Sequence, residues 1–184
     1  MGIRKSGSYS KMKVVPYTRT SKRKNRSYIK AVPPSKIVKF EMGNLIDNRL
    51  GKYPLTLDIF AAENAQIRNN ALEACRQYIN KQLETDLAGQ YYFKVVIYPH
   101  HIQRENKMLT GAGADRMSTG MQLSFGRAIA KAALVKKGTK IFIISVASEK
   151  GVVLARKLIR QIRSKLPCDI KVEFTNNSKV LKVQ

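Results

Sequence analysis

The chain has 184 residues, of which 43% are hydrophobic, and its 35 Lys and Arg against 12 Asp and Glu give a formal net charge of +23. This composition allows one domain with a hydrophobic core, and the excess positive charge indicates a polyanionic partner such as nucleic acid. The sequence disfavours a membrane-spanning or secreted protein. Its longest apolar run, residues 141–147, is too short to span a bilayer, and its N-terminus has no apolar signal region. Cys75 and Cys168 lie in apolar-patterned segments, and we expect buried free thiols.

The positive charge is concentrated in two blocks. Residues 1–39 contain twelve Lys and Arg and no acid. Residues 41–105 contain eight acids and seven bases, whereas residues 106–184 contain sixteen bases and four acids. A uniform solubilising coat would not be distributed in this way, so we expect each block to meet a partner.

Residues 1–35 are predicted to be an extended RNA-binding arm. The segment has few large aliphatic side chains and no helical period, so it cannot bury enough apolar surface to fold alone. Tyr9, Tyr17 and Tyr28 are interleaved with its cations, and this suits RNA, because cations neutralise phosphates while flat rings stack on unpaired bases. The alternative is a solvated tail without a partner. The arm residues expected to bind RNA are Arg4, Lys5, Lys11, Lys13, Arg19, Lys22, Arg23, Lys24, Arg26 and Lys30.

The region after the arm has the periodicities of a folded domain. Residues 36–43 and 53–61 alternate as strands do. Apolar residues at spacings of three and four predict an amphipathic helix over 64–87, which Gly89 ends. A strand rich in aromatic and β-branched residues is predicted at 91–99.

A glycine-rich segment at about 100–118 is predicted to be a protruding loop. No strand or helix pattern is visible over the eighteen residues from His100 to Met117, and loops of that length are usually functional or disordered. Its cations suit RNA, its glycines let the backbone approach a ligand, and its methionines offer adaptable apolar contact. The alternative is a surface loop without a ligand. The residues expected to contact a ligand are Arg104, Lys107, Met108, Gly111, Gly113 and Arg116.

The second half of the chain is predicted to continue the same domain. Strands are expected at 119–126, 128–135, 139–147 and 168–175. The strand at 139–147 is nearly all apolar, so we expect it to be central and covered on both faces. Ser148 is the expected N-cap of a helix that runs to about 165, with Val152, Ala155, Ile159, Ile162 and Leu166 facing inward.

This order contains two strand–helix–strand units, and right-handed crossovers would place both helices on the same side of a sheet. The sequence therefore predicts an α+β fold: a two-layer sandwich of a mixed or antiparallel sheet with two helices on one face. We expect residues 36–184 to form a single domain of this kind.

The second predicted helix carries a run of bases. Arg156, Lys157, Arg160, Arg163 and Lys165 face a single acid, Glu149, so pairing along the helix cannot be their purpose. We favour phosphate contact over the alternative of a solvated face. The residues expected to bind RNA in this half of the chain are Arg127, Lys131, Arg156, Arg160 and Arg163.

No catalytic, metal or cofactor site is predicted. The glycine-rich loop fails both the dinucleotide and the P-loop fingerprints, because Arg116 stands where each pattern requires another residue. His100 and His101 are neighbours on an extended chain and point to opposite sides, so a shared metal is disfavoured, and we expect them to contact phosphate or end a strand. Asp115 has no second carboxylate close in sequence, so an enzyme is unsupported.

The central motifs resemble those of a known family. The stretch "HIQRENKMLTGAGADRMSTGMQLSFGRAIAKAA" at 101–133 combines "NKML", "GAGADR", "TGM" and "FG" at a specific spacing. The segments "YTR" at 17–19, "YIKAVPPSKIVKFEMGN" at 28–44 and "ALEACRQYINKQL" at 71–83 agree with it. Together they resemble universal large-subunit ribosomal protein sixteen, in its archaeal and eukaryotic branch, over essentially the whole chain. The basic stretch at 20–27 departs from the pattern, and the end at Gln184, without the eukaryotic extension, indicates an archaeal source.

The resemblance implies a structural protein of the large ribosomal subunit, bound to ribosomes in the cytoplasm. Such a protein would bind large-subunit rRNA between the central protuberance and the stalk base, and its loop, here about Gln103 to Ser118, would face tRNA near the peptidyl-transferase centre. It implies neighbouring large-subunit ribosomal proteins as further partners, no membrane, no homo-oligomer, no cofactor and no enzymatic activity. Asp115 would fix the loop backbone.

Two other readings remain open on the sequence. One is a free-standing RNA-binding or chaperone-like module with no fixed assembly. The other is an RNA-modifying enzyme that uses the central loop as its active site.

Overall fold

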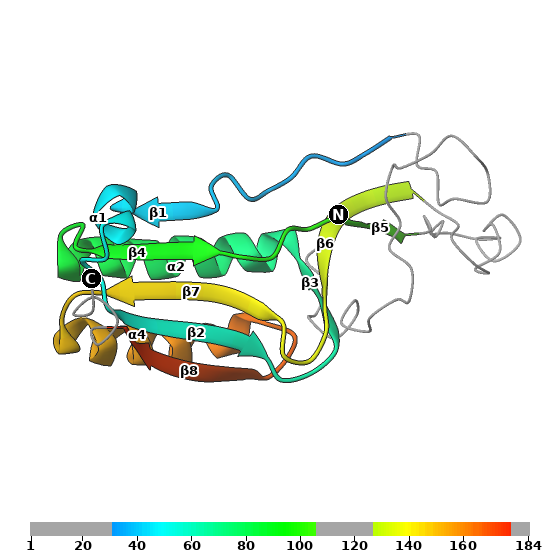
Figure 1. The fold of residues 1–184 in the computed structure, drawn as a ribbon. Coiled ribbons are helices and arrows are strands. Elements are labelled where there is room, and N and C mark those ends of the chain that lie inside the picture. The colour runs from blue at the N-terminus through cyan, green and yellow to red at the C-terminus, as the bar shows by residue number, and fades with distance from the viewer. Residues whose placement is uncertain (1–30, 106–126, 178–184) are drawn as a thin grey trace, which may run out of the picture.

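The computed structural model describes residues 31–105 and 127–177 of the chain. Figure 1 shows the arrangement of its helices and strands. In chain order these are β1 (Glu41–Gly43), α1 (Leu45–Arg49), β2 (Leu55–Ala61), β3 (Ala65–Arg68), α2 (Asn69–Leu87), β4 (Tyr91–Val95), β5 (His101–Glu105), β6 (Arg127–Val135), β7 (Lys140–Val146), α4 (Glu149–Ile162), the 3-10 turn η2 (Arg163–Lys165) and β8 (Ile170–Asn176).

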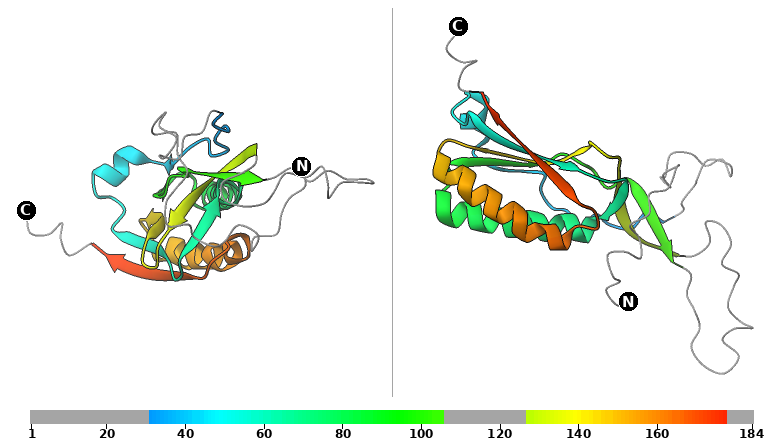
Figure 2. Two further views of the ribbon diagram at one scale, coloured as in Figure 1. Left: turned by 90° about the vertical axis from the view of Figure 1, so that its right-hand side faces the viewer. Right: turned by 90° about the horizontal axis from the view of Figure 1, so that it is seen from below.

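Two antiparallel sheets organise these elements. The larger sheet has five strands in the order β1-β4-β7-β2-β8, and the smaller has three in the order β3-β6-β5. The chain passes from β2 through α2 to β4 and from β7 through α4 to β8, and each crossover skips one strand of the larger sheet, as in split β-α-β units. Both helices lie on one face of that sheet (Figure 2). The predicted α+β sandwich is confirmed, and the smaller sheet is an addition that the sequence did not indicate.

The hydrophobic core lies between the larger sheet and the two helices. Leu57 and Ile59 of β2 stand opposite Ile144 and Phe142 of β7, and all four side chains are fully buried. Burying each such side chain contributes about 1.5–3 kcal/mol. From α2 the helical layer contributes buried Leu72, Cys75, Ile79 and Leu83. From α4 and the turn after it come the residues predicted to face inward, Val152, Ala155, Ile159, Ile162 and Leu166.

The two cysteines are free and buried in this core, as expected. Burial raises the pKa of the Cys75 thiol to about 12 and that of Cys168 to about 11. Because the thiolate is the reactive form, both thiols are inert at neutral pH while the protein is folded.

Local signals define the ends of the long helices. The Ser148 hydroxyl accepts a hydrogen bond of 3.3 Å from the Gly151 amide, which confirms the predicted N-cap of α4. A Cβ at Gly151 would lie 3.0 Å from the Cβ of Val146, so the glycine lets α4 begin close to β7. α2 ends where Ala88 enters the left-handed region with φ of 45°, one residue before the expected Gly89. No helix in the described ranges is long and apolar enough to cross a membrane.

Two predictions in the first half of the domain are wrong in extent. The strand predicted at 36–43 is confined to β1, because only its last three residues pair with β4. Gly43 then turns the chain with φ of +83°, and a Cβ there would lie 2.2 Å from the Tyr91 carbonyl oxygen, so only glycine fits. The helix predicted from residue 64 begins at Asn69, because residues 65–68 pair with β6 as β3.

The centre of the chain differs from the prediction in two ways, and one prediction there is not tested. The strand predicted at 91–99 ends at Val95, after which the chain leaves the larger sheet toward the smaller one (Figure 1). The first residues of the predicted loop, 101–105, form β5, because pairing with β6 stabilises a strand that has no pattern of its own. The strand predicted at 119–126 lies outside the described residues.

Candidate nucleic-acid interface

The flank of α4 next to β8 carries arginines. Successive helical residues are about 100° apart, so Arg156, Arg160 and Arg163 lie together on one side of α4. The Arg156 guanidinium lies 5.7 Å from the ring centre of Phe174 in β8. Arg163 donates hydrogen bonds to Asp169 from Nε at 3.1 Å and from Nη2 at 2.6 Å. Arg163 is thus partly neutralised, whereas neither Arg156 nor Arg160 has a carboxylate partner among the residues that the structure describes.

The opposite flank of α4 faces α2 and is built differently. Tyr78 of α2 donates a hydrogen bond of 2.7 Å to Gln161, and the Lys165 ammonium lies 5.7 Å from the Tyr78 ring centre. These contacts join the two helices at the surface. Lys157 is exposed between the two flanks. All five predicted bases therefore lie on the surface, as expected, and the arginine-rich flank is the one that borders the edge of the sheet.

The smaller sheet carries three further predicted residues. Arg104 lies on β5 opposite Ala128, and Arg127 begins β6 opposite Glu105. Lys131, farther along β6, is half-buried, as is Arg104, whereas Arg127 is exposed. Residues 106–126 connect the paired ends of these two strands. The β5–β6 ribbon extends away from the larger sheet (Figures 1 and 2), so these ends are held apart from the core.

Most other predicted site residues lie outside the described ranges. In the arm they are Arg4, Lys5, Lys11, Lys13, Arg19, Lys22, Arg23, Lys24, Arg26 and Lys30. In the loop they are Lys107, Met108, Gly111, Gly113 and Arg116.

The two histidines have different environments. His101 is 2% exposed, so it does not contact a phosphate on the surface, but it begins β5 and so has the other of its two expected roles, at a strand end. It belongs to a buried polar layer in which Gln103 donates a hydrogen bond of 3.1 Å to Gln66 of β3. His100 is exposed, and its ring centre lies 4.6 Å from that of Tyr98. The residues are adjacent in sequence, but only His100 is accessible.

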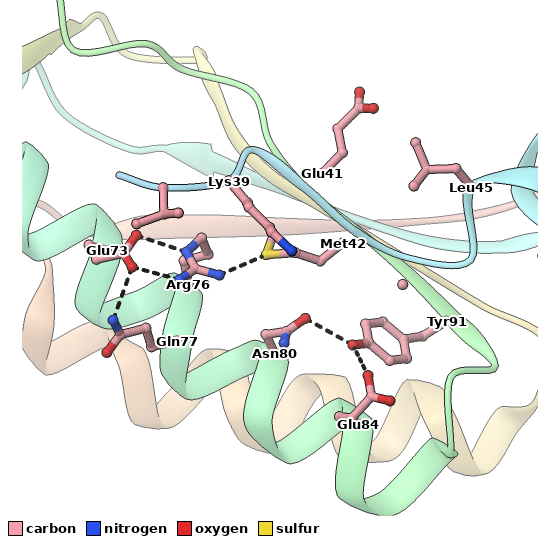
Figure 3. A pocket seen from close by; sticks show the side chains of 12 residues that line it. Lys39, Glu41, Met42, Leu45, Glu73, Arg76, Gln77, Asn80, Glu84 and Tyr91 are labelled. Atoms are coloured by element: carbon pink, nitrogen blue, oxygen red, sulfur yellow. Dashed lines mark hydrogen bonds and ion pairs between the residues drawn. The ribbon is translucent and has the colours of Figure 1, made fainter. Parts of the chain in front are cut away.

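A groove of about 580 Å³ separates α2 from residues 38–45, the segment that joins the arm to the domain (Figure 3). At one end of it, Glu73 accepts hydrogen bonds from Arg76 at 2.8 and 2.6 Å and from Gln77 at 3.0 Å. The Arg76 guanidinium also lies 3.3 Å from the sulfur of Met42. The Arg76 hydrogen bonds hold the pKa of Glu73 below its ordinary value, against the effect of burial.

The other end of the groove is held by Tyr91. Its hydroxyl lies 2.7 Å from a Glu84 carboxylate oxygen and 2.9 Å from the side-chain oxygen of Asn80. Burial, and then the Glu84 carboxylate, raise the pKa of Tyr91. The lining has three carboxylates, Glu41, Glu73 and Glu84, against two cations, Lys39 and Arg76, so the groove is poorly suited to phosphate. Its contacts instead hold Met42 of β1 on α2, a role that sequence reasoning missed because these residues resemble an ordinary helix surface.

The sheet face that lies away from the helices is balanced in charge. Cross-strand pairing aligns Glu41, Lys94, Ile143 and Asp58 in one row on this face. Lys94 pairs with Glu41 at 2.6 Å, and Lys140 pairs with Asp58 at 2.5 Å. Phosphate binding depends on cations that are not already neutralised. The arginine flank of α4 is therefore the better candidate for RNA than this open face.

Comparison with known proteins shows the family to which the chain belongs. A family model described as ribosomal protein L16p/L10e matches residues 13–173. Large ribosomal subunit protein uL16 of Staphylothermus marinus is 42% identical over 175 residues, covering 95% of this chain and 94% of that protein. The protein of the same name from Methanococcus aeolicus is 38% identical over 183 residues, 99% of each chain, and that from Methanoculleus marisnigri is 49% identical over 120 residues, 65% of this chain and 68% of that protein. The chain belongs to the ribosomal protein L16p/L10e family.

Proposed function

We propose that this chain is a structural constituent of the large ribosomal subunit and acts by binding large-subunit rRNA between the central protuberance and the stalk base. The proposal depends on one observation in this member of the family: unpaired cations lie on the helical side of the sheet, whereas the cations on its opposite face are paired with carboxylates. Arg156 and Arg160 are exposed without a carboxylate partner among the described residues, whereas Lys94 and Lys140 on the opposite face are paired. Phosphate contacts would then orient the domain on RNA through its helical side.

The domain organisation follows from the same proposal. Residues 1–35 form a basic arm that binds rRNA, and residues 36–184 form one α+β domain from which the loop at about 100–118 protrudes. The Glu73–Arg76 contact supports the first boundary, because it holds Met42 and the start of β1 on α2. Glu105 and Arg127 stand opposite each other at the ends of β5 and β6. This supports a loop that begins and ends at the tip of the β5–β6 ribbon.

In this proposal the loop faces tRNA near the peptidyl-transferase centre. Arg104 and Arg127, at the described ends of the ribbon, are positioned to contact nucleic acid together with the loop cations. The protein performs no chemistry and uses no cofactor, and it helps to position substrates and to stabilise the surrounding RNA. Its partners are large-subunit rRNA, tRNA and neighbouring large-subunit ribosomal proteins, in the cytoplasm, and it acts as a single copy without a membrane.

Footprinting tests this function. Hydroxyl-radical cleavage of archaeal large-subunit RNA is measured with and without the full chain at physiological salt. We expect protection confined to the region between the central protuberance and the stalk base, and its loss at high salt, because phosphate contacts release bound counterions. Scattered protection, with equal binding to unrelated structured RNA, would instead identify a free-standing RNA-binding module and contradict the proposal.

A further inference from the structure

Strand β8 forms an edge of the larger sheet that the helices do not cover. α4 packs on β2 and β7, and the residues of β8 after Ile170 are all exposed. Phe174 is paired with Leu57 and Val172 with Ile59, so these four side chains share the helical face of the sheet. Leu57 and Ile59 are fully buried, whereas Phe174 is 45% and Val172 42% exposed. An apolar row thus continues from the core into solvent.

Two guanidinium groups border this exposed row. Arg156 lies over the Phe174 ring, and Arg160 follows one helical turn later on the same flank of α4. Arg163, farther along, is occupied by Asp169. Glu173 does not neutralise the site. It stands opposite Asp58 on the neighbouring strand, so its side chain lies on the other face of the sheet. The surface next to Phe174 is consequently aromatic and cationic together.

We propose that Phe174, Arg156 and Arg160 form a binding site for an unpaired nucleotide of rRNA. The base stacks on the Phe174 ring, Val172 extends the apolar contact, and the guanidiniums bind the adjoining phosphates. RNA-binding proteins commonly bind unpaired bases by stacking them on aromatic rings next to arginines. A base inside a duplex is already stacked on its neighbours and has no ring face available. This inference rests on the proposed function, which it refines by assigning a stacking residue.

A protein strand added to β8 is the competing occupant of this edge. Strand addition uses the main-chain groups along the edge of a sheet. Arg156 stands instead over the Phe174 ring on the face of β8, and Arg160 follows it one turn along α4, so both would contact a ligand that lies on the sheet. Their charge is complementary to phosphate and is not neutralised by a described carboxylate, so the geometry favours RNA.

Photo-crosslinking of the full chain tests the site. Archaeal large-subunit RNA is transcribed with 4-thiouridine, bound to the protein at a salt concentration that gives a measurable Kd, and irradiated. We expect crosslinks in the tryptic peptide of residues 172–179, which contains Phe174. Phe174→Ala should lower the affinity roughly fivefold to hundredfold, the range found when a base loses its aromatic partner, and Phe174→Tyr should retain it.

Phe60→Ala is the matched control, because Phe60 also lies under a cation, Lys140 at 5.6 Å, but on the open face of the same sheet. It should leave the affinity unchanged. Circular dichroism verifies that each variant is folded. The native chain could bind large-subunit RNA selectively while Phe174→Ala binds equally well and peptide 172–179 is never crosslinked to RNA. That result would refute this inference but not the proposed function. Crosslinks of this peptide to a protein in assembled subunits would also overturn it. Absence of selective binding by the native chain would refute the proposed function itself.

Discussion

Replacing Glu73 by Ala should loosen the attachment of the β1 segment to α2. The change removes the acceptor of two hydrogen bonds from Arg76 and one from Gln77. The Arg76 side chain is only 12% exposed, so its charge would be left largely buried and without its carboxylate. Breaking a fully buried pair costs about 3–5 kcal/mol and an exposed one about 0–1. For this partly buried pair we expect about 2–4 kcal/mol of unfolding free energy to be lost.

Thermal and urea unfolding, followed by circular dichroism, measure this loss. For a chain of this length each kcal/mol lowers Tm by about 2–4 °C. Glu41→Ala is the control, because the Glu41 side chain is 36% exposed in its pair with Lys94 and should contribute less than about 1 kcal/mol. The double change Glu73→Ala with Arg76→Ala should cost less than the sum of the single changes, since no charge remains unpaired. If Glu73→Ala costs no more than Glu41→Ala, the proposed anchoring contact is wrong.

The same contact predicts a dependence on pH. The pKa of Glu73 is lowered from 4.5, first by the Arg76 hydrogen bonds. A carboxyl group with a lowered pKa in the folded state contributes stability that is complete above the unfolded pKa and is lost as the pH falls through the folded one. We therefore expect the native chain to lose stability below about pH 4.5, and the loss to be smaller in Glu73→Gln.

Three further predictions concern the two charge blocks and the core. Changing Arg4, Lys5, Lys11 and Lys13 together to Glu should weaken assembly into large subunits, measured by co-sedimentation, because the arm would lose most of its excess positive charge; unaltered incorporation would contradict it. Shortening 108–118 should leave co-sedimentation intact but impair tRNA use, measured as tRNA binding to subunits, and normal translation would count against a tRNA-facing loop. Cys75 and Cys168 should resist a thiol reagent at pH 8 until the chain unfolds, because their pKa values are about 12 and 11; prompt labelling of folded protein would show the core assignment to be wrong.

The main features of the larger sheet and its helices were predictable from local patterns. The run at 139–147 is nearly all apolar because β7 is central, and its residues Phe142 and Ile144 are fully buried. Ser148 was recognisable as an N-cap because a hydroxyl that accepts from the backbone of the first turn is a local requirement. Such features depend on neighbours in sequence, so one sequence is enough to find them.

The smaller sheet was not predictable in this way. β3 and β5 have four and five residues, and both are stabilised by pairing with β6, far away in sequence. Ala65–Arg68 continues the apolar period of α2, so pairing with β6 overrode the helical pattern there. Likewise, Phe174 looked like any strand residue, and its exposure follows only from α4 stopping short of β8.

The salt dependence of rRNA binding tests the central claim most directly. Affinity for archaeal large-subunit RNA is measured over a range of KCl concentrations for the native chain, for Arg156→Gln with Arg160→Gln, and for Lys94→Gln with Lys140→Gln. Each lost phosphate contact lowers the slope of log K against log salt by about 0.7–0.9. We predict that the double arginine substitution lowers the slope by about 1.4–1.8. The double lysine substitution should leave the slope unchanged, because Glu41 and Asp58 already neutralise these lysines. A slope that falls with the lysine variant and not with the arginine variant would contradict the account.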